Sequence, residues 1–172
     1  MSHLKKILKL GNPELYEASE NLTKEELPVA LERANEMHNL ILEFRKEYGA
    51  GRAIAAPQIG YKKRMIALYI DRPVVIINPV LFNHSEEMME LWDDCMSFPN
   101  LLVKVRRHKR CSLKFLDEKW EEQIWKLEDD MSELIQHEYD HLDGILATQR
   151  AIDDKSFALA AEIKNAGRQG QA

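Results

Sequence analysis

The segment Gln136-His137-Glu138-Tyr139-Asp140-His141 decides how the whole chain is interpreted. Residues four positions apart lie on one face of an α-helix, so the imidazoles of His137 and His141 can reach the same metal ion. Glu138, next to the first histidine, can then hydrogen-bond a water molecule on that metal. The pattern also occurs by chance in many proteins, so its surroundings must support it.

The residues around this segment favour a buried site over a charged surface helix. Leu134, Ile135 and Leu142 form an apolar stripe on a predicted helix that begins near Asp129. Burying two histidines and a glutamate without partners would be costly. We therefore prefer a metal site to two exposed histidines. A catalytic site of this kind also needs a third protein ligand and an open position for water.

Three positions compete for the role of third ligand. A metzincin-like continuation would place a histidine at position 147, where the chain has Ala147. A thermolysin-like site would use a later glutamate, and Glu162 has a tolerable spacing, but little chain follows for a second lobe. Cys95 lies upstream, and its thiolate suits two histidines around a borderline-soft metal. The alternative for Cys95 is a structural role in the core, which we assign to Cys111.

Composition predicts one globular domain over residues 1–172. Of these residues 45% are hydrophobic, and the chain is long enough to bury a real core. The net charge of −5 argues against DNA as a partner. Two cysteines imply no disulfide framework, and no apolar run is long enough for a signal peptide or a membrane span. We therefore expect a cytoplasmic protein without a membrane partner.

One basic group departs from the acidic balance of the chain. It consists of Lys104, Arg106, Arg107, Lys109 and Arg110. Such a group can contact an RNA surface, but a solvated strand and turn is the simpler interpretation.

The first part of the chain predicts an arm followed by a long helix. Residues 1–22 are expected to form an extended N-terminal arm. Thr23 and Glu26 match a capping box, although Pro28 can shift the start of the helix. Apolar residues then recur every three or four positions, and Gly49 provides the stop.

The middle of the chain predicts β-strands. Residues 65–70 and 74–77 are short β-prone runs, and Asn78-Pro79 is expected to end the second. Residues 111–115 and 123–127 fit a hairpin with one buried face.

The end of the chain returns to a helical period. A last helix is predicted over residues 155–165, within a C-terminal helix and tail of residues 155–172. The fold class is therefore α+β, with mostly antiparallel strands around the central motif helix.

Three segments together resemble the peptide deformylase family. Residues 51–58 correspond to its Gly-rich motif GxGhAAxQ, in which h is apolar. Residues 93–97 correspond to EGCLS, and residues 136–141 to QHExDH. The three motifs occur in the family's order, and the resemblance covers about residues 7–149. It implies the peptide deformylase fold.

The resemblance also implies a hydrolase that removes the formyl group from N-formylmethionyl peptides or a related N-formyl substrate. Cys95, His137 and His141 would hold one divalent metal ion, and Glu138 would act as general acid and base on metal-activated water. Fe2+ is the metal expected physiologically, and Zn2+, Ni2+ or Co2+ fit the same ligands. The implied partners are an N-formylated peptide or nascent chain and, transiently, the ribosome.

Two further groups would stabilise the oxyanion formed from the formyl carbonyl. By similarity these are the side chain of Gln58 and the backbone N–H of Met96. From its position alone, Gln58 would instead be interpreted as a turn-capping amide after Pro57.

The departures from the family pattern cluster on the substrate side. The resemblance implies substrate contacts from Gly51, Ala53, Ile54, Asp94, Glu133 and Leu134. Ala53 and Asp94 replace glycines of the motifs, which restricts close approach of the backbone. Asp130 and Glu133 stand where apolar residues would suit a methionine side chain, unless both acids turn to solvent at the helix start. We therefore expect an intact hydrolytic site with a diverged substrate groove.

Two alternatives stay open at this point. The first is a deformylase-like protein that binds metal or peptide without turnover, which Asp94 and Ala53 favour. The second is a general metallopeptidase with Glu162 as ligand, which predicts that Cys95 is dispensable for metal binding.

Overall fold

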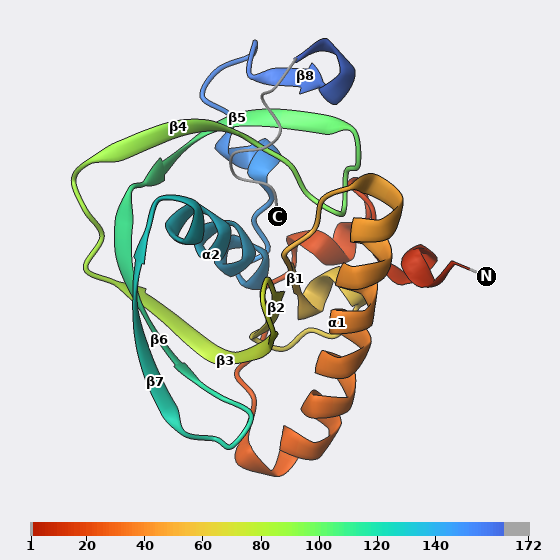
Figure 1. Ribbon diagram of the computed structural model, residues 1–172, viewed down its shortest axis with the longest axis vertical. Coiled ribbons are helices and arrows are strands. Elements are labelled where there is room, and N and C mark those ends of the chain that lie inside the picture. Colours follow the sequence, from red (N-terminus) through yellow and green to blue (C-terminus); the bar gives the residue numbers. More distant parts are fainter. Residues whose placement is uncertain (1, 164–172) are drawn as a thin grey trace.

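Eight β-strands form two antiparallel sheets in the computed structural model, which describes residues 2–163 (Figure 1). The larger sheet has the strand order β1-β2-β3-β6-β7, and the smaller sheet has the order β4-β5-β8. The bounds are β1 Ala53–Ala55, β2 Met65–Tyr69, β3 Pro73–Phe82, β4 Met88–Asp93, β5 Leu101–His108, β6 Arg110–Leu116, β7 Glu122–Glu128 and β8 Phe157–Leu159. The predicted hairpin is confirmed as β6 and β7.

Two α-helices lie on opposite sides of β1 and β2 (Figure 1). The first, α1, covers Leu27–Tyr48, and the second, α2, covers Asp129–Leu142 and carries the histidine motif. The predicted capping box at Thr23 opens a short 3-10 turn, and Pro28 lies in the first turn of α1 itself. Gly49 ends α1 with a φ of 72°, a left-handed conformation that suits glycine. Among the described helices, none is long and apolar enough to cross a membrane.

The side chains of β2 alternate between the two faces of the sheet, so the sheet packs against both helices. Successive side chains of a strand point to opposite faces. Met65 and Ala67 pack in the apolar cluster formed with α1, whereas Ile66 and Leu68 pack in the cluster formed with α2. Both faces of β2 are therefore buried, and α2 is held between the larger sheet and the strands β4 and β5 (Figure 1). The expected α+β fold with a central motif helix is confirmed.

Strand β3 does not end where the sequence suggested. It continues through Asn78 and Pro79 to Phe82, with a shift in its register against β6 between Ile77 and Val80. Proline has no N–H to donate, so a strand accommodates it at a bulge. Asn78 has a φ of 49°, and its side chain bonds both the N–H and the carbonyl of Leu22. The bulge keeps the strand continuous, and the predicted boundary was wrong.

The predicted last helix was also wrong for the described residues. Residues 157–159 form β8, which pairs with β5, and residues 160–162 form a 3-10 turn. The apolar face expected for a helix was modest, and Phe157 and Leu159 are instead exposed on an added edge strand. Strand pairing therefore outweighed the weak helical pattern. Residues 164–172 of the predicted helix and tail lie outside the described part of the chain.

The N-terminal arm runs past the loops that carry the first two sequence motifs. It contains two 3-10 turns, at His3–Lys6 and Pro13–Tyr16, joined by less regular backbone. The N–H of Leu8 donates to the carbonyl of Gln58, and the N–H of Leu10 donates to the carbonyl of Ser97, both at 2.8 Å. The arm therefore ties together the loops that follow β1 and β4.

Candidate metal centre

Two elements bring the three expected metal ligands together. His137 and His141 lie one turn apart on α2, and Cys95 follows directly after β4. One ligand atom from each residue lies within 4.8 Å of the others, and all three side chains are buried. The Sγ of Cys95 is 3.3 Å from Nε2 of His141. The sequence prediction of this cluster is confirmed.

The geometry of the cluster fits a small divalent metal. Metal–sulfur and metal–nitrogen bonds near 2.3 and 2.0 Å in a tetrahedron would put sulfur and nitrogen about 3.5 Å apart. Cys95 and His141 already lie close to that separation. Nε2 of His137 is buried without a hydrogen-bond partner among the described residues. A soft thiolate, two imidazoles and an orphaned ring nitrogen together match the donor set of such an ion.

A tight turn holds Cys95 in place. The N–H of Phe98 donates to the carbonyl of Cys95 at 3.1 Å, which closes the turn after β4. The N–H of Ser97 and the side-chain amide of Gln58 both point at the sulfur, at 3.5 and 3.4 Å. The turn therefore holds the sulfur of Cys95 beside Nε2 of His141.

Asp93 fixes the orientation of His137. Its Oδ2 lies 2.8 Å from Nδ1 of His137, so Nδ1 is the donor and Nε2 is left for the metal. The same Oδ2 accepts a bond from the guanidinium of Arg107 at 3.1 Å. Asp93 is fully buried, so its charge depends on these two partners.

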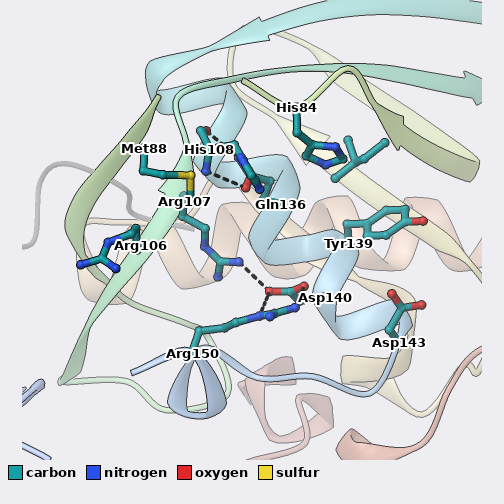
Figure 2. A pocket seen from close by; sticks show the side chains of 11 residues that line it. His84, Met88, Arg106, Arg107, His108, Gln136, Tyr139, Asp140, Asp143 and Arg150 are labelled. Atoms are coloured by element: carbon teal, nitrogen blue, oxygen red, sulfur yellow. Dashed lines mark hydrogen bonds and ion pairs between the residues drawn. The ribbon is translucent and has the colours of Figure 1, made fainter. Parts of the chain in front are cut away.

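Arg107 extends the network one turn further along α2, to Asp140. Asp140 in turn accepts bonds from Arg150 (Figure 2). Nearby, the amide of Gln136 binds the backbone of His108, which ties α2 to the end of β5. Arg107 is therefore a buried support of the metal centre. It does not belong to the solvated basic group in which the sequence placed it.

The pKa values of the two histidines are shifted in opposite directions by burial and by this network. Burial works against a charged His137, but the Asp93 carboxylate and Cys95 raise its pKa well above the usual value. Burial, together with repulsion from His137 and Arg107, lowers the pKa of His141. Although burial opposes its charge, Asp93 has a lowered pKa because His137 and Arg107 stabilise the carboxylate. His137 and Arg107 therefore keep the Asp93 carboxylate negatively charged beside Nδ1 of His137.

Glu138 lies beside the first histidine with an unused carboxylate oxygen. Its side chain is 1% exposed, and Oε2 has no hydrogen-bond partner among the described residues. Burial raises the pKa of Glu138 to about 7. A carboxyl group that titrates near neutrality can both accept and return a proton.

Gln58 is held in one orientation at the edge of the cluster. Its Oε1 accepts the N–H of Ala55 at 2.9 Å, so its NH2 group faces Cys95 and the hydroxyl of Ser97. The turn-capping role that its position suggested is therefore present, and it aims the amide at the metal centre. Met96 is buried directly after Cys95.

The residues expected to contact substrate have different surroundings. Ala53 and Ile54 are buried in β1, which forms one edge of the larger sheet. Gly51 has a φ of 135°, and an added Cβ there would lie 3.1 Å from the side chain of Met96. Asp94 is half-buried and lines a small cavity next to Cys95. Leu134 is fully buried in the core.

The position of Glu133 settles whether this acid turns to solvent at the start of the helix. It does not turn to solvent, unlike the exposed Asp130. Its side chain is 1% exposed, and Oε1 accepts a bond from Arg52 at 2.8 Å. Burial raises the pKa of Glu133 to about 8, with the charge of Asp93 adding to the effect.

Sequence reasoning missed the supporting residues Asp140, Arg150, Ser97 and Arg52. Asp140 lies inside the histidine motif, three residues after His137, and this helical spacing was an available signal. Arg107 reaches Asp93 across the pairing of β4 with β5. The other contacts join segments far apart in the chain, so spacing alone could not reveal them.

Fold and site together define a metallohydrolase: a buried Cys/His/His cluster with an adjacent glutamate on the central helix of an α+β domain. The family model for polypeptide deformylase matches residues 4–157. The chain therefore belongs to the polypeptide deformylase family, and its activity class is that of a peptide deformylase.

Similar proteins agree with this assignment over nearly the whole chain. Peptide deformylase 1 of Prochlorococcus marinus is 34% identical, covering 95% of this chain and 89% of that protein. The peptide deformylase of Pseudothermotoga lettingae is 32% identical, covering 98% and 95%. The crystal structure of the Thermotoga maritima peptide deformylase has a TM-score of 0.75 at 29% identity, covering 86% of this chain and 97% of that one. The Acinetobacter baumannii enzyme bound to Met-Ala-Ser has a TM-score of 0.77 at 28% identity, covering 84% and 96%.

Proposed function

We propose that this protein hydrolyses the formyl group from the N-terminus of N-formylated peptides, with N-formylmethionyl peptides or a related N-formyl substrate as its target. The reaction consumes water, breaks the formyl C–N bond and yields formate and a free amine. One observation carries the proposal: Glu138, buried with an unused oxygen, stands next to the Cys95, His137 and His141 cluster. The Met-Ala-Ser bound to the Acinetobacter baumannii relative is what remains of such a substrate after deformylation.

Glu138 moves the proton in this mechanism. When bound, a divalent metal ion would supply Lewis acidity, which lowers the pKa of a coordinated water and polarises the formyl carbonyl. Glu138 accepts the proton from the attacking water on its free Oε2 and returns it to the nitrogen of the leaving amine. A pKa of about 7 suits both halves of this cycle at neutral pH.

Gln58 and the backbone N–H of Met96 stabilise the developing oxyanion. The Gln58 amide is oriented before substrate arrives, because Ala55 and Ser97 fix both of its ends. Preorganised donors stabilise a transition state without a reorganisation cost, and each is worth about 3 kcal/mol.

Gly51, Ala53, Ile54 and Asp94 flank the position of the substrate backbone. Among the described strands β1 pairs only with β2, so its outer edge is available to an extended peptide. Leu134 supports this region from the core, and Glu133 lines the adjoining cavity. Nascent chains in the cytoplasm, reached by transient contact with the ribosome, belong to the same proposal. Fe2+ is the proposed physiological metal, and Zn2+, Ni2+ or Co2+ are substitutes that fit the same ligands.

Formate release from N-formyl-Met-Ala-Ser, compared with acetate release from N-acetyl-Met-Ala-Ser, tests the proposal. The protein is prepared anaerobically with Fe2+, or with Ni2+, and its metal content is measured first. We expect turnover of N-formyl peptides and little release of acetate. Absence of turnover on every N-formyl peptide tried, by folded and fully metallated protein, would overturn the proposal. That result would favour the binding-only alternative, for which the half-buried Asp94 beside Cys95 is the supporting observation.

A further inference from the structure

The N-terminal arm contacts both loops that carry the proposed oxyanion donors. The N–H of Leu8 donates to the backbone carbonyl of Gln58 at 2.8 Å. The N–H of Leu10 donates to the carbonyl of Ser97, also at 2.8 Å. Ser97 directly follows Met96 in the turn after β4. The two loops are therefore hydrogen-bonded to the same short segment of the arm, residues 8–10.

Lys9 adds a charged contact between these two bonds. Its Nζ lies 3.4 Å from the carbonyl oxygen of Met96. This distance is long for a hydrogen bond, but a full charge still attracts a carbonyl dipole at this range. Burial lowers the pKa of Lys9, and the negative charges of Cys95 and Glu47 act against that shift. Lys9 is therefore a cation beside the backbone of Met96, within electrostatic range of the metal ligand Cys95.

The two proposed donors come from different sheets. Gln58 lies in the 3-10 turn after β1 of the larger sheet, and Met96 lies in the turn after β4 of the smaller sheet. The side-chain amide of Gln58 also binds the hydroxyl of Ser97 at 3.0 Å, but that bond occupies the donor itself. The bonds from Leu8 and Leu10 join main chain to main chain. They can therefore fix the distance between the loops without occupying either donor.

We propose that arm residues 8–10 form a positioning segment that sets the distance between the Gln58 amide and the backbone N–H of Met96. The inference rests on the proposed function, which gives these two groups the role of oxyanion donors. The positioning segment does not touch the reacting atoms and acts through the two loops that it holds. A group displaced by about 1 Å can cost about 100-fold in rate, so the segment influences turnover more than substrate binding.

A pair of variants at Leu8 tests the backbone bond to Gln58. Leu8→Pro removes the N–H, and Leu8→Ala keeps it. Ile7 is extended, with φ −74° and ψ 119°, a conformation that the residue before a proline favours. With N-formyl-Met-Ala-Ser and equal metal content, we expect kcat of Leu8→Pro to be about tenfold or more below that of Leu8→Ala, at similar KM. Equal kcat in the two folded variants would overturn the inference.

Variants of Lys9 test the charged contact and do not depend on the folding of a proline variant. Lys9→Met keeps a stem of similar length without the charge, and Lys9→Arg restores the charge. Lys5→Met, at an exposed lysine of the preceding 3-10 turn, is the matched control. We expect kcat to fall at least about threefold in Lys9→Met, to recover in Lys9→Arg and to match wild type in Lys5→Met. Wild-type kcat in Lys9→Met contradicts the inference.

A thioformyl substrate separates positioning from general damage to the site. N-thioformyl-Met-Ala-Ser presents sulfur, a weaker hydrogen-bond acceptor than oxygen, to the two donors. Loss of metal or of folded protein slows both substrates alike, whereas displaced donors slow the oxygen substrate more. We expect the formyl-to-thioformyl ratio of kcat, measured by release of the free amine, to fall at least about threefold in Leu8→Pro and Lys9→Met. An unchanged ratio in both variants would show that the segment does not position the donors.

Hydrogen exchange of the metal-loaded proteins separates this inference from the proposed function. Deuterium uptake is measured by mass spectrometry in peptides that contain residues 55–60 and 94–98. We expect faster uptake at 55–60 in Leu8→Pro than in Leu8→Ala, and faster uptake at 94–98 in Lys9→Met than in Lys5→Met. These differences support the positioning segment even if wild type releases no formate, a result that refutes only the proposed function. Equal uptake in both pairs overturns the inference even if N-formyl-Met peptides are hydrolysed.

Discussion

Nδ1 of His137 lies 2.8 Å from Oδ2 of Asp93, and both side chains are completely enclosed by the protein. This contact joins the last residue of β4 to the motif helix, two residues before the Cys95 ligand. It therefore fixes the imidazole and the thiolate relative to each other. Asp93 stands where the family motif has a glutamate, and its side chain reaches the histidine.

Substitution of Asp93 should weaken metal binding. Asp93→Asn keeps the shape of the side chain but removes the charge that orients His137 and pairs with Arg107. We expect the affinity for Zn2+ to fall about 10–100-fold. Competition with a chromophoric chelator measures this affinity. Asp143→Asn, at the exposed end of the same helix, is the control and should bind metal like wild type; equal loss in both variants would contradict the role of Asp93.

The two cysteines should behave differently when replaced by serine. Cys95→Ser removes a soft ligand, and we expect metal affinity to fall at least about tenfold or the preferred metal to change. Cys111→Ser alters a core residue that contacts Ser132, so metal content should persist. Elemental analysis after dialysis gives the stoichiometry. Full occupancy in Cys95→Ser would instead favour Glu162 as a ligand, although the described cluster does not include it.

Loss of the Gln58 amide should reduce turnover more than binding. Gln58→Ala removes the donor held between Cys95 and Ser97. Its proposed contact forms with the oxyanion, so we expect kcat to fall about 100–1000-fold while KM changes little. Steady-state kinetics with measured metal content distinguish this from metal loss. A rise in KM at unchanged kcat would assign Gln58 to substrate binding alone.

Glu133 should make the stability of the protein depend on pH. Burial raises its pKa from 4.5 to about 8, with Asp93 adding to this effect and Arg52 and His137 opposing it. Between these values the folded protein keeps a proton that the unfolded chain releases. The free energy of unfolding therefore falls as pH rises from about 5 to 8, by up to about 1.4 kcal/mol per pH unit.

Urea denaturation of the metal-loaded protein between pH 6 and 8 measures this dependence. Glu133→Gln cannot ionise, so its free energy of unfolding should lose the part of the slope that Glu133 causes. The difference between wild type and variant isolates this residue from all other titrating groups. Parallel curves for the two proteins would show that Glu133 does not hold a proton in the folded state.

The three candidate metal ligands could be predicted from the sequence because the patterns that indicate them are local. The spacing of His137 and His141 within one helix gives their common face directly. Cys95 could be identified because it stands in a short motif of its own, and Cys111 could be assigned to the core from strand alternation. The structure confirms each of these assignments.

The residues that support the metal ligands could not be predicted from local spacing. Arg107 lies in a run of basic residues, and only the pairing of β4 with β5 turns it inward towards Asp93. For Glu133 the sequence left two positions open, towards the substrate side or towards solvent at the helix start, and its buried pairing with Arg52 on another segment decides between them. Residues 157–159 were predicted as helix because local sequence patterns do not show that these residues pair with β5, which lies far away in the sequence.

Formate release from N-formyl peptides by wild type and Glu138→Ala, at equal and measured metal occupancy, shows whether Glu138 carries the deformylase reaction. The peptide set includes N-formyl-Met-Ala-Ser. We expect turnover by wild type and a loss of about 100-fold or more in Glu138→Ala, because the proton acceptor is gone while the ligands remain. Equal rates in the two proteins would rule out Glu138 as the proton acceptor, and no formate from any peptide at full metal occupancy would rule out deformylation.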